Sequence, residues 1–255
     1  MKHNITNYVI LILTLYSSIV TAQPLLVGHR GSYWGVENTA EAFHNGALAG
    51  YQYLECDIKV AEDGTIVLTH DDTTKRLGGS LTINKATLTE LKAETYTQTR
   101  GGVEYTGTIC TLTEFLDICA EYNIRPVIEL KWATGINSND CSGISALVDL
   151  IDKKGFRHTC VILTSMKPCL EYIRTYYPDI ELQLLIRNYT SEHFNWCKKW
   201  KIDADIHHSS ITKKIVNKYH KKGLKVNAWT VNNDSIYNSL SQIGCDFVTT
   251  DYLKR

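Results

Sequence analysis

The sequence carries no net charge, because its 255 residues include 27 lysines and arginines and 27 aspartates and glutamates. This balance excludes the broad positive field by which many proteins attract nucleic acids. The sequence also lacks long proline, glycine or serine tracts and internal repeats, so we expect a single domain without a linker. None of the eight cysteines stands in a CxxC spacing, which argues against a structural zinc site.

The longest apolar run lies at the start of the chain, where Lys2 precedes the segment YVILILTLYSSIV. A short apolar run followed by small residues, here VTA, is typical of a signal peptide. We therefore expect residues 1–22 to be a signal peptide and residues 23–255 to form the mature domain. The protein would be exported to the periplasm or the extracellular space, without stable membrane insertion after cleavage. An uncleaved membrane anchor is the alternative.

Short β-branched runs alternate with helix-like segments along the rest of the chain. Eight such runs lie at 25–29, 53–60, 126–130, 160–165, 181–186, 204–208, 225–231 and 246–251. Several of the intervening segments open with Asn, Ser or Thr, and four end at Gly. The alternation predicts an α/β fold, a TIM (β/α)₈ barrel, with its active site at the carboxyl ends of the strands. A doubly wound sheet is the alternative, but no GxGxxG motif follows the first strand.

Two features depart from a regular barrel. The run TIVLTHD follows AEDG, a turn signal that predicts an extra β-hairpin arm folding back on the second strand. This arm would place His70 opposite Glu55 and Asp57. The sequence ends four residues after the last predicted strand, so we expect a truncated final helix. The polar stretch at 71–107 predicts a loop and a short helix at the rim of the site.

Acidic residues gather on two of the predicted barrel strands. Glu55 and Asp57 are two residues apart, so both side chains point to the same face of the second strand. Glu129 stands at the end of the third barrel strand. Three carboxylates from neighbouring strands suit one divalent cation, Ca²⁺ or Mg²⁺, better than zinc. The alternatives are a solvated strand end for the first two acids and a structural ion pair between Glu129 and Lys131.

Two histidines and two cationic residues stand near these acids. His29 ends the first strand and His70 ends the hairpin arm. Imidazole titrates near neutral pH, so one ring could accept a proton while the other donates one. Arg30 and Lys131 could hold the oxygens of a phosphate group. A metal, two histidines and two cations favour phosphodiester cleavage over other common reactions.

The chain resembles the glycerophosphodiester phosphodiesterase family, whose members have a PLC-like phosphodiesterase TIM barrel. The resemblance extends over nearly the whole mature chain and rests on the ordered segments HRG, ENT, ECD, EDG, HD, IELK, NAWTVN and FVTTD. It implies the following roles: general acid and base for His29 and His70, metal ligands for Glu55, Asp57 and Glu129, and phosphate contacts for Arg30 and Lys131.

Other positions in these motifs have less direct roles. By the same resemblance, Trp229 in NAWTVN forms an aromatic wall against the glycerol or the leaving group, and a tryptophan in the barrel core is the alternative. Glu37 and Asn38, in ENT, are expected to order the first loop. The family often has a proline where this chain has Val36, and its IPTLEE stands here as ICTLTE. Neither difference involves a proposed catalytic atom.

The expected activity is metal-dependent hydrolysis of glycerophosphodiesters to glycerol 3-phosphate and an alcohol, with a small-molecule substrate and no nucleic-acid partner. Two steps stay open: whether water or the glycerol 2-hydroxyl attacks, and which histidine acts first. One alternative is a phosphodiesterase for lysophospholipid or sphingolipid head groups, for which Tyr33 and Trp34 could supply apolar contacts. The other is a protein that binds phosphodiesters without cleaving them. His207 and His208 are expected at the rim, rather than in a second metal site.

Overall fold

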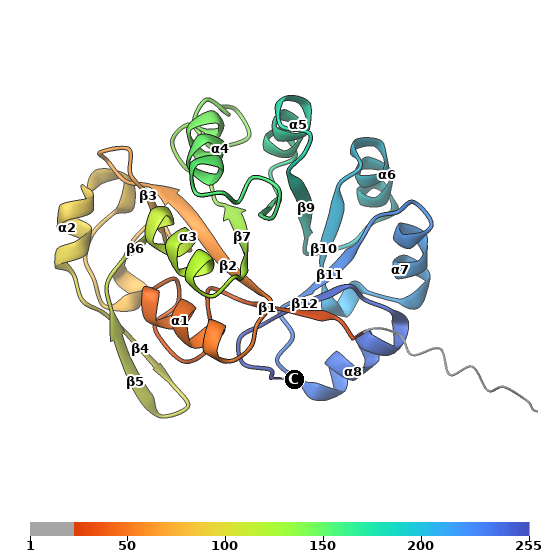
Figure 1. The fold of residues 1–255 in the computed structure, drawn as a ribbon, viewed down its shortest axis with the longest axis horizontal. Helices are drawn as coiled ribbons and strands as arrows, with labels where there is room; N and C mark the ends of the chain where they lie inside the picture. Colours follow the sequence, from red (N-terminus) through yellow and green to blue (C-terminus); the bar gives the residue numbers. More distant parts are fainter. Residues whose placement is uncertain (1–22, 255) are drawn as a thin grey trace, which may run out of the picture.

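The computed structural model describes residues 23–254, in which eight parallel strands form a closed barrel (Figure 1). The ring closes because β1 pairs in parallel with both β2 and β12. The predicted TIM barrel is therefore confirmed. The barrel strands are β1 (Leu25–Gly28), β2 (Tyr53–Val60), β7 (Arg125–Leu130), β8 (Val161–Thr164), β9 (Glu181–Ile186), β10 (Asp203–His207), β11 (Val226–Trp229) and β12 (Phe247–Thr250).

Helices between successive barrel strands cover the outside of the ring (Figure 1). They are α1 (Ala40–Leu48), α3 (Leu112–Glu121), α4 (Ile144–Lys153), α5 (Lys167–Tyr176), α6 (Ser191–Trp200), α7 (Lys213–His220) and α8 (Asp234–Ile243). Residues 251–254, which follow β12, form no helix. Within residues 23–254, no helix is long and apolar enough to cross a membrane.

The predicted hairpin arm is present. β2 continues beyond the barrel and is followed by β3 (Ile66–Leu68), which pairs antiparallel with it so that Ile58 faces Leu68. Gly64 in the connecting turn has φ +82°, a conformation that residues with a side chain rarely adopt. The arm ends just before His70 and thus brings this histidine back toward the carboxyl end of the barrel.

The segment between β3 and β6 (Cys110–Thr111) is larger than the predicted loop and short helix. It contains two 3₁₀ helices, α2 (Leu88–Ala93) and a second hairpin made of β4 (Tyr96–Arg100) and β5 (Val103–Gly107). A small core of its own holds these elements: Val36, Ala61, Val67, Leu77, Ile83, Ala86, Leu91, Tyr96 and Ile109. The hairpin escaped prediction because YTQTR and VEYTG contain too few apolar residues to show the alternation of a strand.

The barrel interior is apolar at one end and polar at the other. Near the amino ends of the strands, apolar side chains close the interior: Val27, Tyr53, Val127, Val161 and Phe247. Leu163 packs with the same cluster and also lines the cavity. Burying a large apolar side chain stabilises a fold by about 1.5–3 kcal/mol. Further along, Asn227 forms hydrogen bonds with Gln183 and Thr249. The interior of the barrel is therefore filled near the amino ends of the strands and opens at their carboxyl ends.

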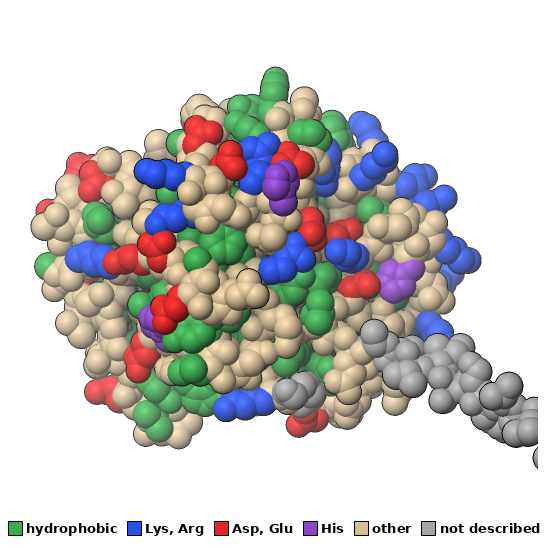
Figure 2. All heavy atoms as spheres, viewed as in Figure 1, with side chains coloured by type: hydrophobic (Ala, Val, Ile, Leu, Met, Phe, Trp, Pro, Cys, Tyr) green, Lys and Arg blue, Asp and Glu red, His purple; other side chains and the backbone are tan. Residues whose placement is uncertain are grey.

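The surface carries both charges. On the face in Figure 2, lysine and arginine side chains are interspersed with aspartate and glutamate side chains. Ion pairs between neighbouring surface side chains include those of Arg157 with Asp179 and of Lys154 with Asp117. The mixture is what the balanced composition leads one to expect.

Candidate active site

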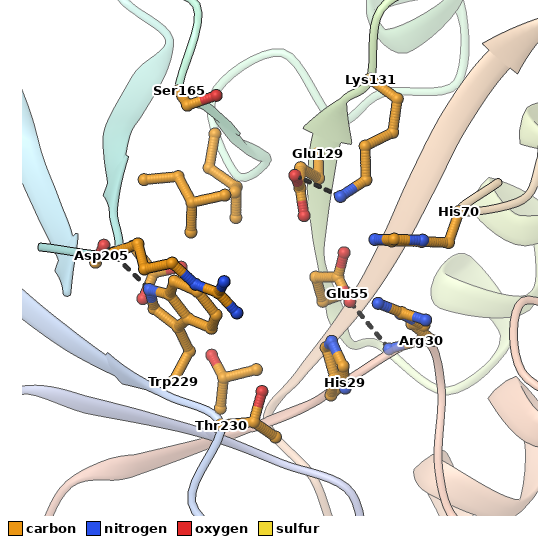
Figure 3. A pocket seen from close by; sticks show the side chains of 14 residues that line it. His29, Arg30, Glu55, His70, Glu129, Lys131, Ser165, Asp205, Trp229 and Thr230 are labelled. Atoms are coloured by element: carbon orange, nitrogen blue, oxygen red, sulfur yellow. Dashed lines mark hydrogen bonds and ion pairs between the residues drawn. The ribbon is translucent and has the colours of Figure 1, made fainter. Parts of the chain in front are cut away.

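A cavity of about 500 Å³ opens at the carboxyl ends of the barrel strands (Figure 3). Most of the site residues predicted from the sequence line it: His29, Arg30, Glu55, His70, Glu129, Lys131 and Trp229. The exception is Asp57, which is fully buried just beneath the wall. The fold thus brings together residues that lie up to 200 positions apart in the sequence.

The three predicted metal ligands form one cluster. Asp57 on β2 lies in register with Glu129 on β7, and carboxylate oxygens of Glu55, Asp57 and Glu129 all lie within 4.8 Å of one another. Glu55 is 3% exposed, and its Oε1 has no hydrogen-bond partner in the described part of the chain. Burial and the neighbouring acids raise the pKa of Glu55 well above its usual range and that of Glu129 to about 7. Such a crowded, underbonded set of oxygens fits a divalent cation.

Positive side chains contact the cluster but neutralise it only in part. Lys131 Nζ lies 2.5 Å from Glu129 Oε1 and 3.1 Å from Asp57 Oδ1, so the ion pair considered as an alternative is present. Arg30 Nε lies 3.2 Å from Asp57 Oδ2. Burial would raise the pKa of Asp57, but Lys131 and Arg30 outweigh it and hold that pKa well below its usual range. Because Lys131 and Arg30 both pair with Asp57, they compensate the negative charge of Glu55 only in part.

The HRG segment bends sharply where β1 ends. Arg30 has φ +50°, and in this conformation its backbone N–H donates to Glu55 Oε2 at 2.8 Å. Gly31 has φ +93° and packs against α1, where an added Cβ would lie 2.8 Å from the carbonyl carbon of Ala42. Backbone strain of this kind, about 1 kcal/mol or more for a non-glycine residue, is typical of functional sites. The bend places the Arg30 side chain over the acid cluster.

Asn38 ties the first loop to the same cluster. Its side-chain amide donates to Asp57 Oδ2 at 2.9 Å, and its Oδ1 accepts from the backbone N–H of Asp57 at 3.1 Å. Asn38 has φ +58°, which asparagine tolerates better than most residues. The loop-ordering role expected for this residue therefore has a definite structural form.

Glu37 joins the first loop to the segment between β3 and β6. Its carboxylate accepts hydrogen bonds from Arg30 at 2.8 Å, from Arg76 at 2.6 Å and from Gln98 at 3.1 Å. Arg100 lies 3.7 Å away. Burial opposes ionisation, but Arg76 and Arg30 lower the pKa of Glu37 to about 2. The sequence did not predict these partners, because no motif marks them.

Each histidine is paired with an aspartate. His29 Nδ1 lies 2.8 Å from Asp251 Oδ1, and His70 Nδ1 lies 2.7 Å from Asp71 Oδ1. These contacts orient both rings and leave Nε2 of each as the nitrogen available to a substrate. Burial lowers the pKa of His70 below its usual value. The aspartates stand in the HD and FVTTD segments, so the motifs contained this signal although no role was predicted for them.

Trp229 is half-buried and lines the cavity, rather than filling the barrel core. Its indole N–H donates to the backbone oxygen of Asp205 at 3.2 Å, which fixes the ring plane. The rings of His207 and His208 stack at 4.6 Å, and His207 packs edge-on against Trp229 at 5.2 Å. Neither histidine lines the cavity, and the acid cluster is the one potential metal group found among the described residues.

Comparisons with known proteins agree with this geometry. The sequence model described as the glycerophosphoryl diester phosphodiesterase family matches residues 28–255. Glycerophosphodiester phosphodiesterases from Caldanaerobacter subterraneus and Bacillus altitudinis are each 26% identical, over 234 and 248 residues, which cover 89% of this chain and 93% of theirs.

Solved structures show the same architecture. A phosphodiesterase from Oleispira antarctica, in complex with the product sn-glycerol-3-phosphate, superposes with a TM-score of 0.78 at 25% identity, covering 90% of this chain and 94% of that one. A glycerophosphodiester phosphodiesterase from Thermotoga maritima superposes with a TM-score of 0.72 at 23% identity, covering 90% and 95%. Both superpositions extend over 90% of this chain, so the barrel fold is shared.

Proposed function

The chain belongs to the glycerophosphoryl diester phosphodiesterase family, and we propose that it hydrolyses glycerophosphodiesters to glycerol 3-phosphate and an alcohol with the aid of one divalent cation. The resemblance seen in the motifs and the expectation of a phosphodiesterase are thereby confirmed at the level of the family. One observation carries the proposal: His29 and His70 share a cavity with an acid cluster and with two cations, Arg30 and Lys131.

The phosphate group is proposed to lie between Arg30 and Lys131. Figure 3 shows both side chains on the same side of the cavity as Glu55 and Glu129. A guanidinium and an ammonium can together hold the charge of a phosphodiester, and the guanidinium can do so in bidentate fashion. The sn-glycerol-3-phosphate in the Oleispira relative supports a small phosphorylated substrate.

The cation is proposed to be held by Glu55, Asp57 and Glu129. Oxygen ligands of this kind suit both Ca²⁺ and Mg²⁺. The unpartnered Oε1 of Glu55 and the raised pKa values of Glu55 and Glu129 support this ligand set, because a cation would relieve both. When bound, the ion would stabilise negative charge that develops on the phosphate oxygens.

His29 and His70 are proposed to divide the acid and base roles. One Nε2 would take the proton of the attacking hydroxyl, either of water or of the glycerol itself, and the other would protonate the oxygen of the leaving alcohol. Asp251 and Asp71 would stabilise the imidazolium that forms on each ring. Loss of either histidine should lower the rate by about 10²–10⁴.

The test uses the chain from residue 23 with glycerophosphocholine, glycerophosphoethanolamine and glycerophosphoinositol. Release of glycerol 3-phosphate is followed with Ca²⁺, with Mg²⁺ and with chelator, for wild type, His29→Ala and Glu55→Gln. His158→Ala is the matched control, because His158 is 78% exposed and pairs with Asp179 away from the cavity. We expect wild type and His158→Ala to release glycerol 3-phosphate in a metal-dependent way, and His29→Ala and Glu55→Gln to lose this release. No release by folded wild type under any condition would contradict the proposal.

The alternative functions find less support in the structure. A lysophospholipid or sphingolipid substrate needs apolar contacts near the cavity, but Tyr33 packs against Tyr252 and Trp34 lies under Lys254, and neither lines the wall. A protein that only binds phosphodiesters has no need for two histidines oriented by carboxylates. Both alternatives predict no release of glycerol 3-phosphate in the assay above.

We also propose that residues 1–22 are a signal peptide and that the protein is exported. This segment lies outside the described residues, so the support is its sequence alone: Lys2, the apolar run and the small residues before Gln23. Expression of the full chain in a bacterial host, followed by amino-terminal sequencing of the exported fraction, should give Gln23 as the first residue. A product that keeps Met1 and stays with the membrane would instead indicate the uncleaved anchor.

A further inference from the structure

The cavity wall opposite the acid cluster carries polar side chains that the proposed hydrolysis does not use. Ser165 follows β8, Arg187 follows β9 and Asp205 lies in β10, and all three line the cavity. Figure 3 shows Ser165 and Asp205 across the cavity from Glu129 and Lys131. If a phosphate is held on the Lys131 side, one of its two ester arms could reach across the cavity to this opposite wall.

Asp205 is the strongest sign that the wall binds a ligand. The residue is 3% exposed, and its Oδ1 has no hydrogen-bond partner in residues 23–254. Its neighbours inside the barrel are satisfied without it, because Asn227 bonds to Gln183 and Thr249 instead. A buried carboxyl oxygen without a partner destabilises a fold. Its position on the cavity wall indicates that a ligand group supplies the missing hydrogen bond.

Arg187 and Ser165 add complementary groups at the mouth of the cavity. Both are exposed, and the Arg187 guanidinium makes no hydrogen bond or ion pair with any described residue. A guanidinium only donates hydrogen bonds, the unprotonated oxygen of a carboxyl group accepts them and a hydroxyl does both. Together the three side chains match a ligand that carries several hydroxyl groups.

The same groups disfavour the cationic alcohols found in many glycerophosphodiesters. A trimethylammonium group forms no conventional hydrogen bond and is bound best by several aromatic faces, whereas this wall offers one indole, that of Trp229. The positive charge of Arg187 repels both choline and ethanolamine. We propose that Ser165, Arg187 and Asp205 bind the hydroxyls of the leaving alcohol, an inference that rests on the proposed function. Diesters of polyols such as inositol or glycerol would then be preferred over those of choline.

The test compares kcat/KM for glycerophosphoinositol and glycerophosphocholine, for wild type, Arg187→Met and Arg187→Glu. Arg187 is exposed, so neither change threatens folding. A hydrogen bond to a charged group corresponds to about a tenfold to hundredfold change in affinity, so Arg187→Met should lower the inositol-to-choline ratio about tenfold. Arg187→Glu should lower it further, because the new charge attracts choline. Lys214→Met, which removes an exposed cation outside this cavity, should leave the ratio unchanged.

Asp205→Val gives a second, independent measurement. Its unfolding temperature should equal or exceed that of wild type, because the buried Oδ1 of Asp205 has no hydrogen-bond partner to lose among the described residues. Its kcat/KM should nevertheless fall for glycerophosphoinositol more than for glycerophosphocholine.

The outcomes separate this inference from the function on which it rests. An inositol-to-choline ratio that Arg187→Met and Asp205→Val leave unchanged overturns the inference, while hydrolysis by wild type upholds the proposed function. Equal losses on both substrates also overturn it, because the wall would then hold the glycerol arm that all substrates share. Hydrolysis of neither substrate by wild type overturns both.

A separate observation concerns two cysteines. The sulfur atoms of Cys141 and Cys169 lie 3.8 Å apart, and each lies near the backbone oxygen of Asn137. Cys141 is half-buried in the loop between β7 and α4, and Cys169 lies in the first turn of α5. Both segments follow barrel strands at the cavity end, and the loop begins at Lys131.

We infer that Cys141 and Cys169 form a disulfide when the protein meets a small-molecule disulfide such as oxidised glutathione. The thiolate of the more accessible Cys141 attacks the oxidant, giving a mixed disulfide and one free small thiol. The thiolate of Cys169 then displaces the second small thiol. The protein thereby loses two electrons and two protons, and the oxidant is reduced to two thiols. The bond would tie the loop after Lys131 to α5.

Peptide mapping tests this pairing. The folded protein is incubated with oxidised glutathione or with dithiothreitol, free thiols are alkylated, and the digest is examined by mass spectrometry. A linked Cys141–Cys169 peptide pair in the oxidised sample only is expected, together with a rise in unfolding temperature that Cys141→Ser lacks. Full alkylation of both thiols after oxidation of the native protein, or linkage of either to another cysteine, would overturn the inference.

Discussion

Glu37 allows the organisation of the site to be tested through stability, because one buried carboxylate holds arginines from two separate segments. Its side chain is 5% exposed and lies 2.8 Å from Arg30 and 2.6 Å from Arg76. Burial by itself would raise the pKa of Glu37, but the two arginines lower it from 4.5 to about 2. Each pKa unit corresponds to about 1.4 kcal/mol, so ionised Glu37 should contribute about 3 kcal/mol to folding stability at pH 7.

Glu37→Gln should therefore lower the free energy of unfolding by about 3 kcal/mol at pH 7. The pKa of Glu37 is lower in the folded protein than in the unfolded chain. Its contribution to stability is therefore complete at pH values above the pKa of the unfolded chain, and is lost as the pH falls toward the pKa of the folded protein. The difference between wild type and Glu37→Gln should shrink to about 2 kcal/mol at pH 3.5 and to about 1 kcal/mol at pH 2.5.

Urea unfolding followed by circular dichroism at each pH measures the difference. Asp117→Asn is the control, since Asp117 is 60% exposed and pairs with Lys154 at the surface. Its loss should stay below about 1 kcal/mol. If Glu37→Gln loses no more than this control, or if its deficit is the same at every pH, the reasoning about the buried arginine cluster is wrong.

Two further predictions concern the histidines. Asp251→Asn should lower kcat by about tenfold or more, because the contact of His29 with Asp251 orients the imidazole ring and stabilises its charged form. The rise in unfolding temperature produced by Ca²⁺ or Mg²⁺ should stay as in wild type. An unchanged kcat would argue against a role for the His29–Asp251 pair. The pKa of His70, measured by NMR titration, should lie below 6.5 because of burial. It should fall further in Asp71→Asn, since the bond to Asp71 raises it; a rise would contradict the proposed environment.

Much of the site could be predicted because its residues lie at fixed places on regular elements. The pleat of a strand sends Glu55 and Asp57 to one face, whatever the rest of the fold does. The short turn at Gly64 sets the register of β3 against β2 and so brings His70 back beside Asp57. His29, Arg30 and Lys131 follow strands, and the carboxyl ends of parallel strands meet at one end of a barrel.

The groups that orient these residues could not be predicted in the same way. Asp251 meets His29 across 222 positions, and Arg76 reaches Glu37 across 39. Both contacts depend on how distant segments are placed in three dimensions. The role of Asp205 could not be predicted either, because a single aspartate in a strand does not indicate whether its carboxyl group finds a hydrogen-bond partner.

The amino-acid sequence by itself determined the alternation of strands and helices, the hairpin arm, and which side chains face the open end of the barrel. These features follow from interactions among near neighbours in the chain, such as strand pleating, helix capping and turn conformation. The tertiary structure alone decided that β1 pairs with β12, and with that closure it set Asp251 against His29. It also left the Oδ1 of Asp205 and the guanidinium of Arg187 at the cavity without a hydrogen-bond partner among residues 23–254, since only the packed barrel settles which polar groups satisfy one another and which stay available to a ligand.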